Sequence, residues 1–474
     1  MRFSIRLQAL ALAAALSGAI PSFAPAQSAG EIDFDSLRDE TARLLSEYIR
    51  INTSNPPGNE LAAARWLQQV LAREGIEGQI LDTAELGPGR ANFYARIKGN
   101  GSAKAIALVH HMDVVPATRE QWSVDPFGGE IKDGSVWGRG ALDMKGQAVV
   151  HLMALIAMKR MGLPLTRDLV LIGNADEESD GLGTRTFIAR HPDLLADVEY
   201  LLTETEQNRV ENGKVRWFGI DVGEKRIFWR RVTVKGTAEH GSEPTGHNPV
   251  PRLAKIIARL DAWQTPLRVV PAVDRYFKSQ ASYSTGEGRR WLANAEKALL
   301  SPRGRAWLLS DPERNALLRN TVSPTVLTGS DKTNSIPGEA SVELDIRLLP
   351  DEDTVAFRRE LLRVIADTGA VLTSVADTPP RYDAPLGTDL FHAIETVVGR
   401  LLPGVPVASP INVGGSDRPY YAETGIICYG VSPFLVEFAQ LLRQYHGIDE
   451  RMPLESLGFG LRLYIGILRE MENR

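Results

Sequence analysis

The spacing of apolar residues changes along this chain, and the change predicts an α/β fold. Residues 34–49 and 60–73 carry apolar side chains at helical spacing. Another apolar segment of helix length covers residues 147–161. Three short continuous apolar runs of strand character lie at residues 105–109, 169–173 and 200–202. Buried runs that alternate with helices are typical of a doubly wound, mainly parallel sheet.

A second pattern begins near residue 224 and predicts a smaller, separate domain. Its segments are a strand at 226–235, a helix at 249–263, strands at 324–328 and 340–348, a helix at 354–366 and a strand at 370–376. This βαββαβ order is the ferredoxin-like arrangement. Residues 265–322 interrupt the pattern, and we expect them to form an extra helical segment.

The α/β pattern resumes near Leu386, beyond the end of the smaller domain. We therefore expect a domain of residues 224–380 to be inserted between two parts of a larger domain, residues 31–223 and 381–474. The total length of 474 residues suits two or three domains, with cores large enough to need no covalent staples.

The first residues have the pattern of a secretory signal peptide. Arg2 and Arg6 precede an apolar stretch at residues 7–20, and Ala24-Pro25-Ala26 supplies small residues at a cleavage site. The alternative is a membrane anchor, but about twenty apolar residues are needed to span a bilayer, and this stretch is shorter. We expect cleavage after residues 1–26, no membrane anchor in the mature chain, and a periplasmic or secreted location.

Composition narrows the choice of partners. The formal net charge is −5, and no long basic run is present, so a nucleic-acid partner is not expected. Cys428 is the single cysteine, so no disulfide can form within the chain. It lies in an apolar, strand-like run, which favours a buried structural thiol over a nucleophile.

Acidic and imidazole side chains follow each of the three short apolar runs. His111 and Asp113 follow the first run, Glu177 and Glu178 the second, and Glu204 the third. The carboxyl ends of parallel strands meet at one edge of a sheet, so these groups are expected to converge. Asp143, which follows a Gly-rich turn, is expected to join them.

So many negative charges can be buried together only if cations neutralise them. Histidine with several carboxylates suits zinc, with cobalt or manganese as substitutes. In a two-metal site the ions lie roughly 3.5–4 Å apart and share a ligand, which a carboxylate can be. His446 is the best candidate for a second histidine ligand.

The motifs around these residues resemble those of the M20 family of zinc metallopeptidases and aminoacylases. The matching segments are His111-Met112-Asp113-Val114-Val115-Pro116, Gly138-Arg139-Gly140-Ala141-Leu142-Asp143-Met144-Lys145-Gly146, Asp176-Glu177-Glu178, Gly236-Thr237-Ala238-Glu239-His240, Asn334-Ser335-Ile336-Pro337, Asp345-Ile346-Arg347-Leu348-Leu349-Pro350 and Gly414-Gly415-Ser416-Asp417. They occur in the family's order, and the resemblance extends from about Phe34 to the C-terminus.

The resemblance implies a role for each candidate metal ligand. Asp143 would bridge two zinc ions; His111 and Glu204 would complete the ligands of one ion, and Glu178 and His446 those of the other. The family often has Leu-Asp-Glu-Gly around the third carboxylate, whereas this chain has Leu202-Thr203-Glu204-Thr205-Glu206. The register favours Glu204, although Glu206 offers the same side chain two residues on.

The resemblance also implies the remaining site residues. Glu177 would be the general base for the attacking water, and Asp113 would hydrogen-bond the second ring nitrogen of His111. The smaller domain would be a lid through which the protein forms a homodimer. His240, across the dimer interface, and Asn334 would stabilise the oxyanion, while Arg347 would bind the substrate carboxylate.

The expected activity is therefore hydrolysis of a peptide amide bond next to a free C-terminal carboxylate, as in a carboxypeptidase or dipeptidase. An N-acyl amino-acid hydrolase (aminoacylase) is the alternative, because pocket shape decides between them. A non-catalytic peptide-binding protein on the same fold is a third reading, but it would have no need of a general base. No Gly-x-Ser-x-Gly motif of a serine hydrolase is present.

Overall fold

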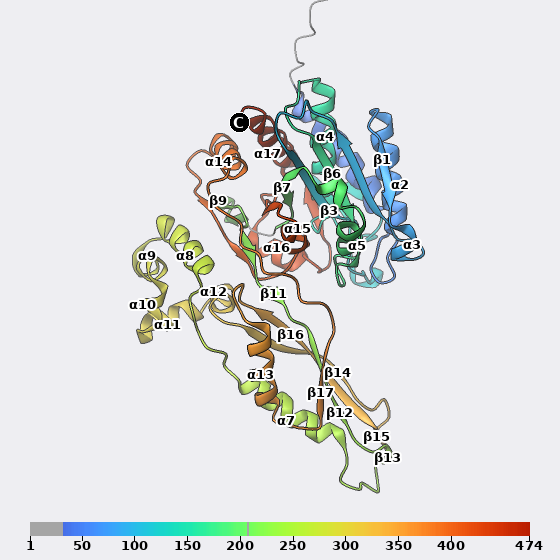
Figure 1. Cartoon of the computed structure of the whole chain (residues 1–474), viewed down its shortest axis with the longest axis vertical. Coiled ribbons are helices and arrows are strands. Elements are labelled where there is room, and N and C mark those ends of the chain that lie inside the picture. The colour runs from blue at the N-terminus through green and yellow to red at the C-terminus, as the bar shows by residue number, and fades with distance from the viewer. Residues whose placement is uncertain (1–31, 206–207) are drawn as a thin grey trace, which may run out of the picture.

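The structure is a computed structural model that describes residues 32–205 and 208–474. The signal peptide expected at residues 1–26 and the alternative ligand Glu206 lie outside the described residues. The chain forms a large α/β part and an elongated smaller part that extends away from it (Figure 1).

The large part is built on a six-stranded, mainly parallel sheet, as predicted. In spatial order its strands are β1 (Gly78–Leu81), β2 (Asn92–Ile97), β6 (Leu169–Asn174), β3 (Ala105–His111), β7 (Val198–Thr203) and β20 (Ile427–Gly430). The last four strands of this order are parallel, and β1 and β2 are antiparallel at one edge. All seven residues of β3 are buried, as the continuous apolar run predicts for a strand covered on both faces.

Helices cover both faces of this sheet. Those of the larger layer are α1 (Phe34–Ile49), α2 (Glu60–Arg73), α4 (Lys145–Met161), α14 (Asp389–Leu401) and α17 (Leu454–Met471). The opposite face is covered by α5 (Leu182–Arg190), α6 (Pro192–Leu195) and α15 (Arg418–Glu423). α4 is buried on all sides from Lys145 to Met158, because it lies between the sheet and the helices α1 and α17. The doubly wound fold class is thus confirmed.

The smaller part has the predicted ferredoxin-like sheet. Its strands are β17 (Ala370–Ser374), β12 (Arg230–Lys235), β16 (Glu339–Leu348) and β14 (Thr321–Thr328), all antiparallel, and β11 (Arg226–Ile227) pairs with the end of β16. Alternate residues of β16 point into a core shared with α7 (Pro249–Ala262) and α13 (Thr354–Ile365). The strand expected at 226–235 is divided into β11 and β12 by Phe228 and Trp229.

The segment that interrupts this pattern is helical, as expected, but it packs on the large part. Its helices are α8 (Pro271–Tyr283), α9 (Gly286–Ala293), α10 (Ala295–Leu299), α11 (Pro302–Leu309) and α12 (Pro312–Leu317). Tyr276 and Phe277 of α8 are fully buried in the same apolar cluster as the main sheet. The ring of Tyr276 lies edge-on to Trp217, with 6.2 Å between centroids. These helices therefore join the base of the smaller part to the large part.

The remaining elements are short. The helices are α3 (Thr83–Leu86), α16 (Phe438–Gln444) and the 3-10 helix η1 (Arg119–Gln121); the strands are β4 (Glu130–Lys132), β5 (Ser135–Trp137), β8 (Asn208–Glu211), β9 (Lys214–Gly219), β10 (Gly223–Glu224), β13 (Glu239–His240), β15 (Ser335–Ile336), β18 (Val407–Ala408), β19 (Ile411–Asn412) and β21 (Arg451–Pro453). Cys428 is buried in β20. Across residues 32–205 and 208–474, no helix has the length and apolar character to cross a membrane.

The docking of α8 generates a stability prediction. Phe277→Ala should lower the free energy of unfolding by about 3–5 kcal/mol, because it removes a fully buried aromatic ring from the main core. Leu300→Ala is the matched control, since that side chain is 85% exposed. Chemical denaturation followed by tryptophan fluorescence measures both; equal shifts for the two variants would show that α8 is not part of the core.

Candidate metal centre

The residues expected to bind metal converge at the carboxyl edge of the main sheet. His111 ends β3, Glu178 lies in the turn after β6, and Glu204 follows β7. Asp143 precedes α4, and His446 follows α16. With the exception of His111, which is buried behind them, these side chains line one cleft of about 580 Å³. The topology of the sheet therefore brings together residues more than 300 positions apart in the sequence.

Asp143 lies between the two histidines. Its Oδ1 is 3.1 Å from His111 Nε2, and its Oδ2 is 3.0 Å from His446 Nε2. Glu204 Oε2 lies 3.6 Å from His111 Nε2, and Glu178 Oε2 lies 3.1 Å from His446 Nε2. The side chains thus form two groups, each with one histidine and one glutamate, that share a single aspartate.

The donor set fits metal ions. Ligand atoms of His111, Asp143 and Glu178 lie within 4.8 Å of one another, as do those of His111, Glu177 and Glu204. Glu178 Oε1 is buried and has no hydrogen-bond partner among the described residues. A buried carboxylate oxygen left without a partner is costly, and a cation would satisfy it. Imidazole and carboxylate ligands together suit zinc, cobalt or manganese.

The charges in the cleft show the same need for cations. Burial and the charge of Asp143 raise the pKa of Glu178 to about 7. Burial and the charge of Glu204 raise the pKa of Glu177 well above its usual range. Hydrogen bonds to Asp143 and Glu178 raise the pKa of His446 to about 10. A cation in the cleft would lower all three pKa values, because it would neutralise part of this negative charge.

Asp113 holds two parts of the site. His111 Nδ1 lies 3.0 Å from the main-chain oxygen of Asp113 and 3.6 Å from its carboxylate Oδ1. The carboxylate accepts hydrogen bonds from the main-chain N–H groups of Glu177, at 3.2 Å, and Glu178, at 3.1 Å. Asp113 therefore orients the imidazole ring mainly through its backbone and the acidic turn through its side chain.

Glu450 and Arg139 also support the metal centre, although sequence reasoning assigned them no role. The buried Glu450 carboxylate accepts hydrogen bonds from the main-chain N–H groups of Gly140, Leu142 and Asp143, at 2.6–3.1 Å. It also pairs with Arg139 at 2.7 Å, and Arg139 donates to the carbonyl of Gly447, next to His446. This pair ties the Asp143 loop to the His446 loop. The available signal was that Arg139 lies in the glycine-rich segment before Asp143 and that Glu450 lies four residues after His446.

Arg347 lines the same cleft, which it reaches from β16. Its Nε donates to Asp345 Oδ1 at 2.7 Å, and Trp229 Nε1 donates to the same oxygen at 2.8 Å. The guanidinium lies 5.6 Å from the centroid of the Trp229 ring. Asp345 therefore fixes the arginine and the indole together as one wall of the cleft.

His240 and Asn334 are not brought to the metal residues within one chain. β13 and β15, which carry or adjoin them, lie at the end of the smaller part farthest from the main sheet (Figure 1). Gly241 donates its N–H to the carbonyl of Asn334 at 2.8 Å, and the exposed His240 contacts Ser242. As far as the structure describes the chain, neither residue lines the metal cleft.

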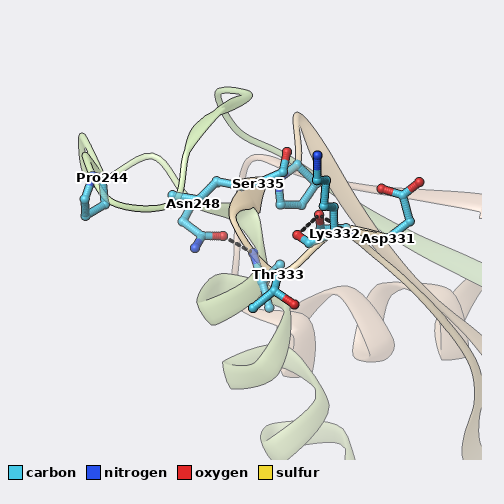
Figure 2. Close-up of a pocket in the computed structure, with 11 residues that line it drawn as sticks. Pro244, Asn248, Asp331, Lys332, Thr333 and Ser335 are labelled. Atoms are coloured by element: carbon cyan, nitrogen blue, oxygen red, sulfur yellow. Dashed lines mark hydrogen bonds between the residues drawn. The ribbon is translucent and has the colours of Figure 1, made fainter.

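This tip contains a pocket of its own, of about 610 Å³. Figure 2 shows Asn248, Asp331, Lys332, Thr333 and Ser335 around it, with Pro244 on the neighbouring loop. Apart from Pro244, the side chains named here are polar. Among the described residues, this pocket contains no cluster of candidate metal ligands such as the one in the main cleft.

Comparisons with known proteins place this geometry in a wider group. The sequence profile of the family described as Peptidase family M20/M25/M40 matches residues 107–470. The N-fatty-acyl-amino acid synthase/hydrolase PM20D1 of Xenopus tropicalis is 25% identical over 374 residues, which is 77% of this chain and 72% of that protein. The probable carboxypeptidase S-like 2 of Dictyostelium discoideum is 24% identical over 78% of this chain and 72% of that protein.

The fold has solved counterparts. The M20 family metallo-carboxypeptidase Sso-CP2 from Sulfolobus solfataricus superposes with a TM-score of 0.70 at 18% identity, over 92% of this chain and 100% of that one. At this identity the likeness concerns the fold.

The raised pKa of His446 predicts proton release on metal binding. Near pH 7 this histidine is protonated in the metal-free protein, so loading with zinc should release at least one proton per chain. Metal affinity should therefore rise with pH until the pKa of about 10 is passed. Without metal, the contacts of protonated His446 with Asp143 and Glu178 stabilise the folded state. This stabilisation is complete below about 6.5, the pKa of histidine in the unfolded chain, and it is lost as the pH rises through about 10.

Titration calorimetry in two buffers of different ionisation enthalpy measures this release. His446→Ala should reduce both the number of ions bound and the number of protons released. Identical metal counts and proton counts for the variant and the parent would remove His446 from the ligand set.

Proposed function

The chain belongs to the peptidase family M20/M25/M40, and we propose that it hydrolyses amide bonds on the acyl side of an amino acid with a free carboxylate. The observation that carries this proposal is the cleft itself. Glu177 lies in it beside the metal-binding side chains, grouped with His111 and Glu204, and Arg347 lines the same cleft. We propose two zinc ions as the metals, with cobalt or manganese as substitutes.

Glu177 is the general base in this proposal. Bound zinc would polarise the scissile carbonyl and acidify the attacking water. Glu177 accepts the proton of that water and returns it to the leaving amine nitrogen. Its half-buried carboxylate lies beside Glu204 and His111. The hydrogen bond from the main-chain N–H of Glu177 to the Asp113 carboxylate fixes the backbone that carries this side chain.

Arg347 recognises the free carboxylate of the substrate. Asp345 accepts hydrogen bonds from its Nε at 2.7 Å and from its Nη2 at 3.5 Å, which holds the guanidinium plane, and in this proposal Nη1 makes the charge-assisted pair with the substrate. The leaving group is thereby an amino acid held at its carboxylate, with its amide nitrogen near the metal centre. This requirement is common to carboxypeptidases, dipeptidases and N-acyl amino-acid hydrolases.

A carboxypeptidase or dipeptidase is the first candidate, and an N-acyl amino-acid hydrolase is the second. The observation that supports the second candidate is the presence of apolar side chains in the cleft wall. Leu442 is 59% exposed although it lines the cleft, and Val115 lies on the same lining. An exposed leucine at a binding cleft suits an apolar acyl group.

The test is amine release from a panel of dipeptides and N-acyl amino acids by the zinc-loaded protein. Glu177→Gln should lower kcat by about 10²–10⁴-fold, because the amide cannot accept the proton, and should leave both metal sites occupied. Substrates whose carboxylate is converted to an amide should be poor, because they cannot pair with Arg347.

The pattern of release decides between the two candidates. Preference for dipeptides supports the first, and preference for long-chain N-acyl amino acids supports the second. A Glu177→Gln protein as active as the parent would exclude this glutamate as the base. Equal hydrolysis of free and amidated substrates would exclude Arg347 as the carboxylate site.

We further propose that the smaller part is a lid that forms a homodimer, with His240 and Asn334 acting at the partner's metal centre. The support is their position at the tip, away from their own cleft. β14 is an edge strand whose Val326 and Leu327 are 52% and 67% exposed. An apolar edge strand is a ready surface for pairing with a second chain.

Subunit exchange tests the shared site. His240→Ala and Glu177→Gln should each be nearly inactive alone. After exchange, about a quarter of the parent activity should return, because half of the random dimers contain one intact composite site. Asn334→Ala behaves like His240→Ala if it serves the same oxyanion. A mixture no more active than its separate components would place His240 outside the reaction.

The signal peptide of residues 1–26 and a periplasmic or secreted location stay predictions. N-terminal sequencing of the protein from its native host tests the cleavage directly, and retention of Met1 would exclude it.

A further inference from the structure

The turn that carries Glu177 and Glu178 begins with an unusual backbone conformation. Asp176 has a φ of +68°, in the left-handed region that non-glycine residues seldom adopt. Such a conformation costs of order 1–3 kcal/mol and persists where the surrounding structure holds it. The base and one metal ligand follow directly, so the direction of this turn decides where both side chains point.

Asn55 lies between the two aspartates of the site. Its Nδ2 donates one hydrogen bond to Asp113 Oδ2 at 2.8 Å and another to Asp176 Oδ1 at 2.9 Å. Its own backbone N–H is anchored on the carbonyl of Val114 at 2.9 Å. Asp113 in turn holds the N–H groups of Glu177 and Glu178. A single amide group therefore links both ends of the acidic turn.

Arg90 holds the same aspartate from the other side. Its Nη2 lies 2.7 Å from Asp176 Oδ1 and 2.7 Å from Glu60 Oε1. Its Nε also donates to Glu60 Oε2 at 3.2 Å. The side chains are almost wholly enclosed: Arg90 is 14% exposed, Glu60 0% and Asp176 5%. A guanidinium that is paired with two carboxylates and buried to this extent has a fixed orientation, unlike one in an exposed ion pair.

The loop above this ion pair leaves it no room to move. Gly58 has a φ of +86°, and a Cβ there would lie 2.8 Å from both Arg90 Nε and Glu60 Oε2. Only glycine fits this approach. A continuous and rigid series of side-chain hydrogen bonds and ion pairs therefore connects α2 to the acidic turn. Its members are Glu60, Arg90, Asp176, Asn55 and Asp113.

We propose that Arg90 and Asn55 are positioning residues that hold the 176–178 turn, so that Glu177 faces the attacking water and Glu178 reaches its metal ion. Neither residue lines the cleft among the described residues, so they act through Asp176 and Asp113. This proposal rests on the proposed function for the role of Glu177, but its metal-binding part does not.

Matched variants of two similar ion pairs test the proposal. Arg90→Lys can keep only part of the double pairing with Glu60 and Asp176. Arg96→Lys is the control, because Arg96 is 12% exposed and pairs at 2.5 Å with Asp168, which is 10% exposed. Asp168 precedes β6 and Asp176 follows it, so the two pairs lie at opposite ends of one strand.

Asn55 offers a second, independent pair of variants. Asn55→Asp has the same shape but loses both donors and adds a third carboxylate beside Asp113 and Asp176. Asn55→Ser removes the amide without adding charge, so it keeps the test valid if Asn55→Asp does not fold.

We expect Arg90→Lys, Asn55→Asp and Asn55→Ser to lower kcat per metal-loaded chain by about 10–100-fold, with KM within about twofold. The affinity for one of the two zinc ions should fall by a similar factor, while the other ion binds as in the parent. Arg96→Lys should change neither quantity. Thermal denaturation of all four proteins reports their stability separately from these effects.

Two outcomes overturn the proposal. One is a kcat and a metal affinity for the Arg90 and Asn55 variants that match those of Arg96→Lys. The other is equal loss of affinity at both metal sites, which would indicate general unfolding of the centre. If the parent cleaves no substrate, the proposed function fails, whereas the zinc titration still decides whether these residues hold the turn.

Discussion

The structure depends on the burial of several carboxylates at one edge of a sheet. Asp143, Glu177, Glu178 and Glu204 converge there because parallel strands and their loops all end at the same edge. Like charges this close are tolerated only with protons or cations among them, and burial raises the pKa of Glu177 and Glu178 accordingly. The histidines on either side of Asp143 divide this charge into two metal-binding groups. This concentration of negative charge is what a pair of divalent cations would neutralise.

Around this centre, buried partners hold the loops and turns that carry the reactive side chains. Glu450 and Arg139 fix the Asp143 loop against the His446 loop, and Asp113 holds the turn of Glu177 and Glu178. Arg90 and Asn55 extend that support into α2 and the loop before it. These bonds use main-chain N–H groups and charged pairs in places where water is excluded, so their geometry is narrow. A site built this way has its ligands in position before the metal arrives.

The lid is attached to the large part at two places. Helices α8–α12 bury aromatic rings in the main core, and the segment near Glu224, where the smaller part begins, is tied to the large part by the fully buried Arg418. Arg418 pairs with Glu224 at 3.2 Å and with Asp221 at 3.4 Å. The base of the lid, with Arg347 and Trp229, is thereby fixed over its own cleft. The tip is free of these attachments, and β13, which carries His240, lies far from the main sheet of the same chain (Figure 1).

The sequence by itself determined the fold class, the order of the lid strands and the candidate ligands, because apolar period and position after a strand are local properties. It could place His111, Glu178 and Glu204 at one edge because strand direction follows from the alternation of strands and helices. Only the tertiary structure decided that α8 packs on the large part, against β18 and β19, since a helical pattern does not say which surface covers it. Only the tertiary structure likewise joined Asn55, Arg90 and Asp176, because hydrogen bonds across as many as 121 residues leave no spacing to read.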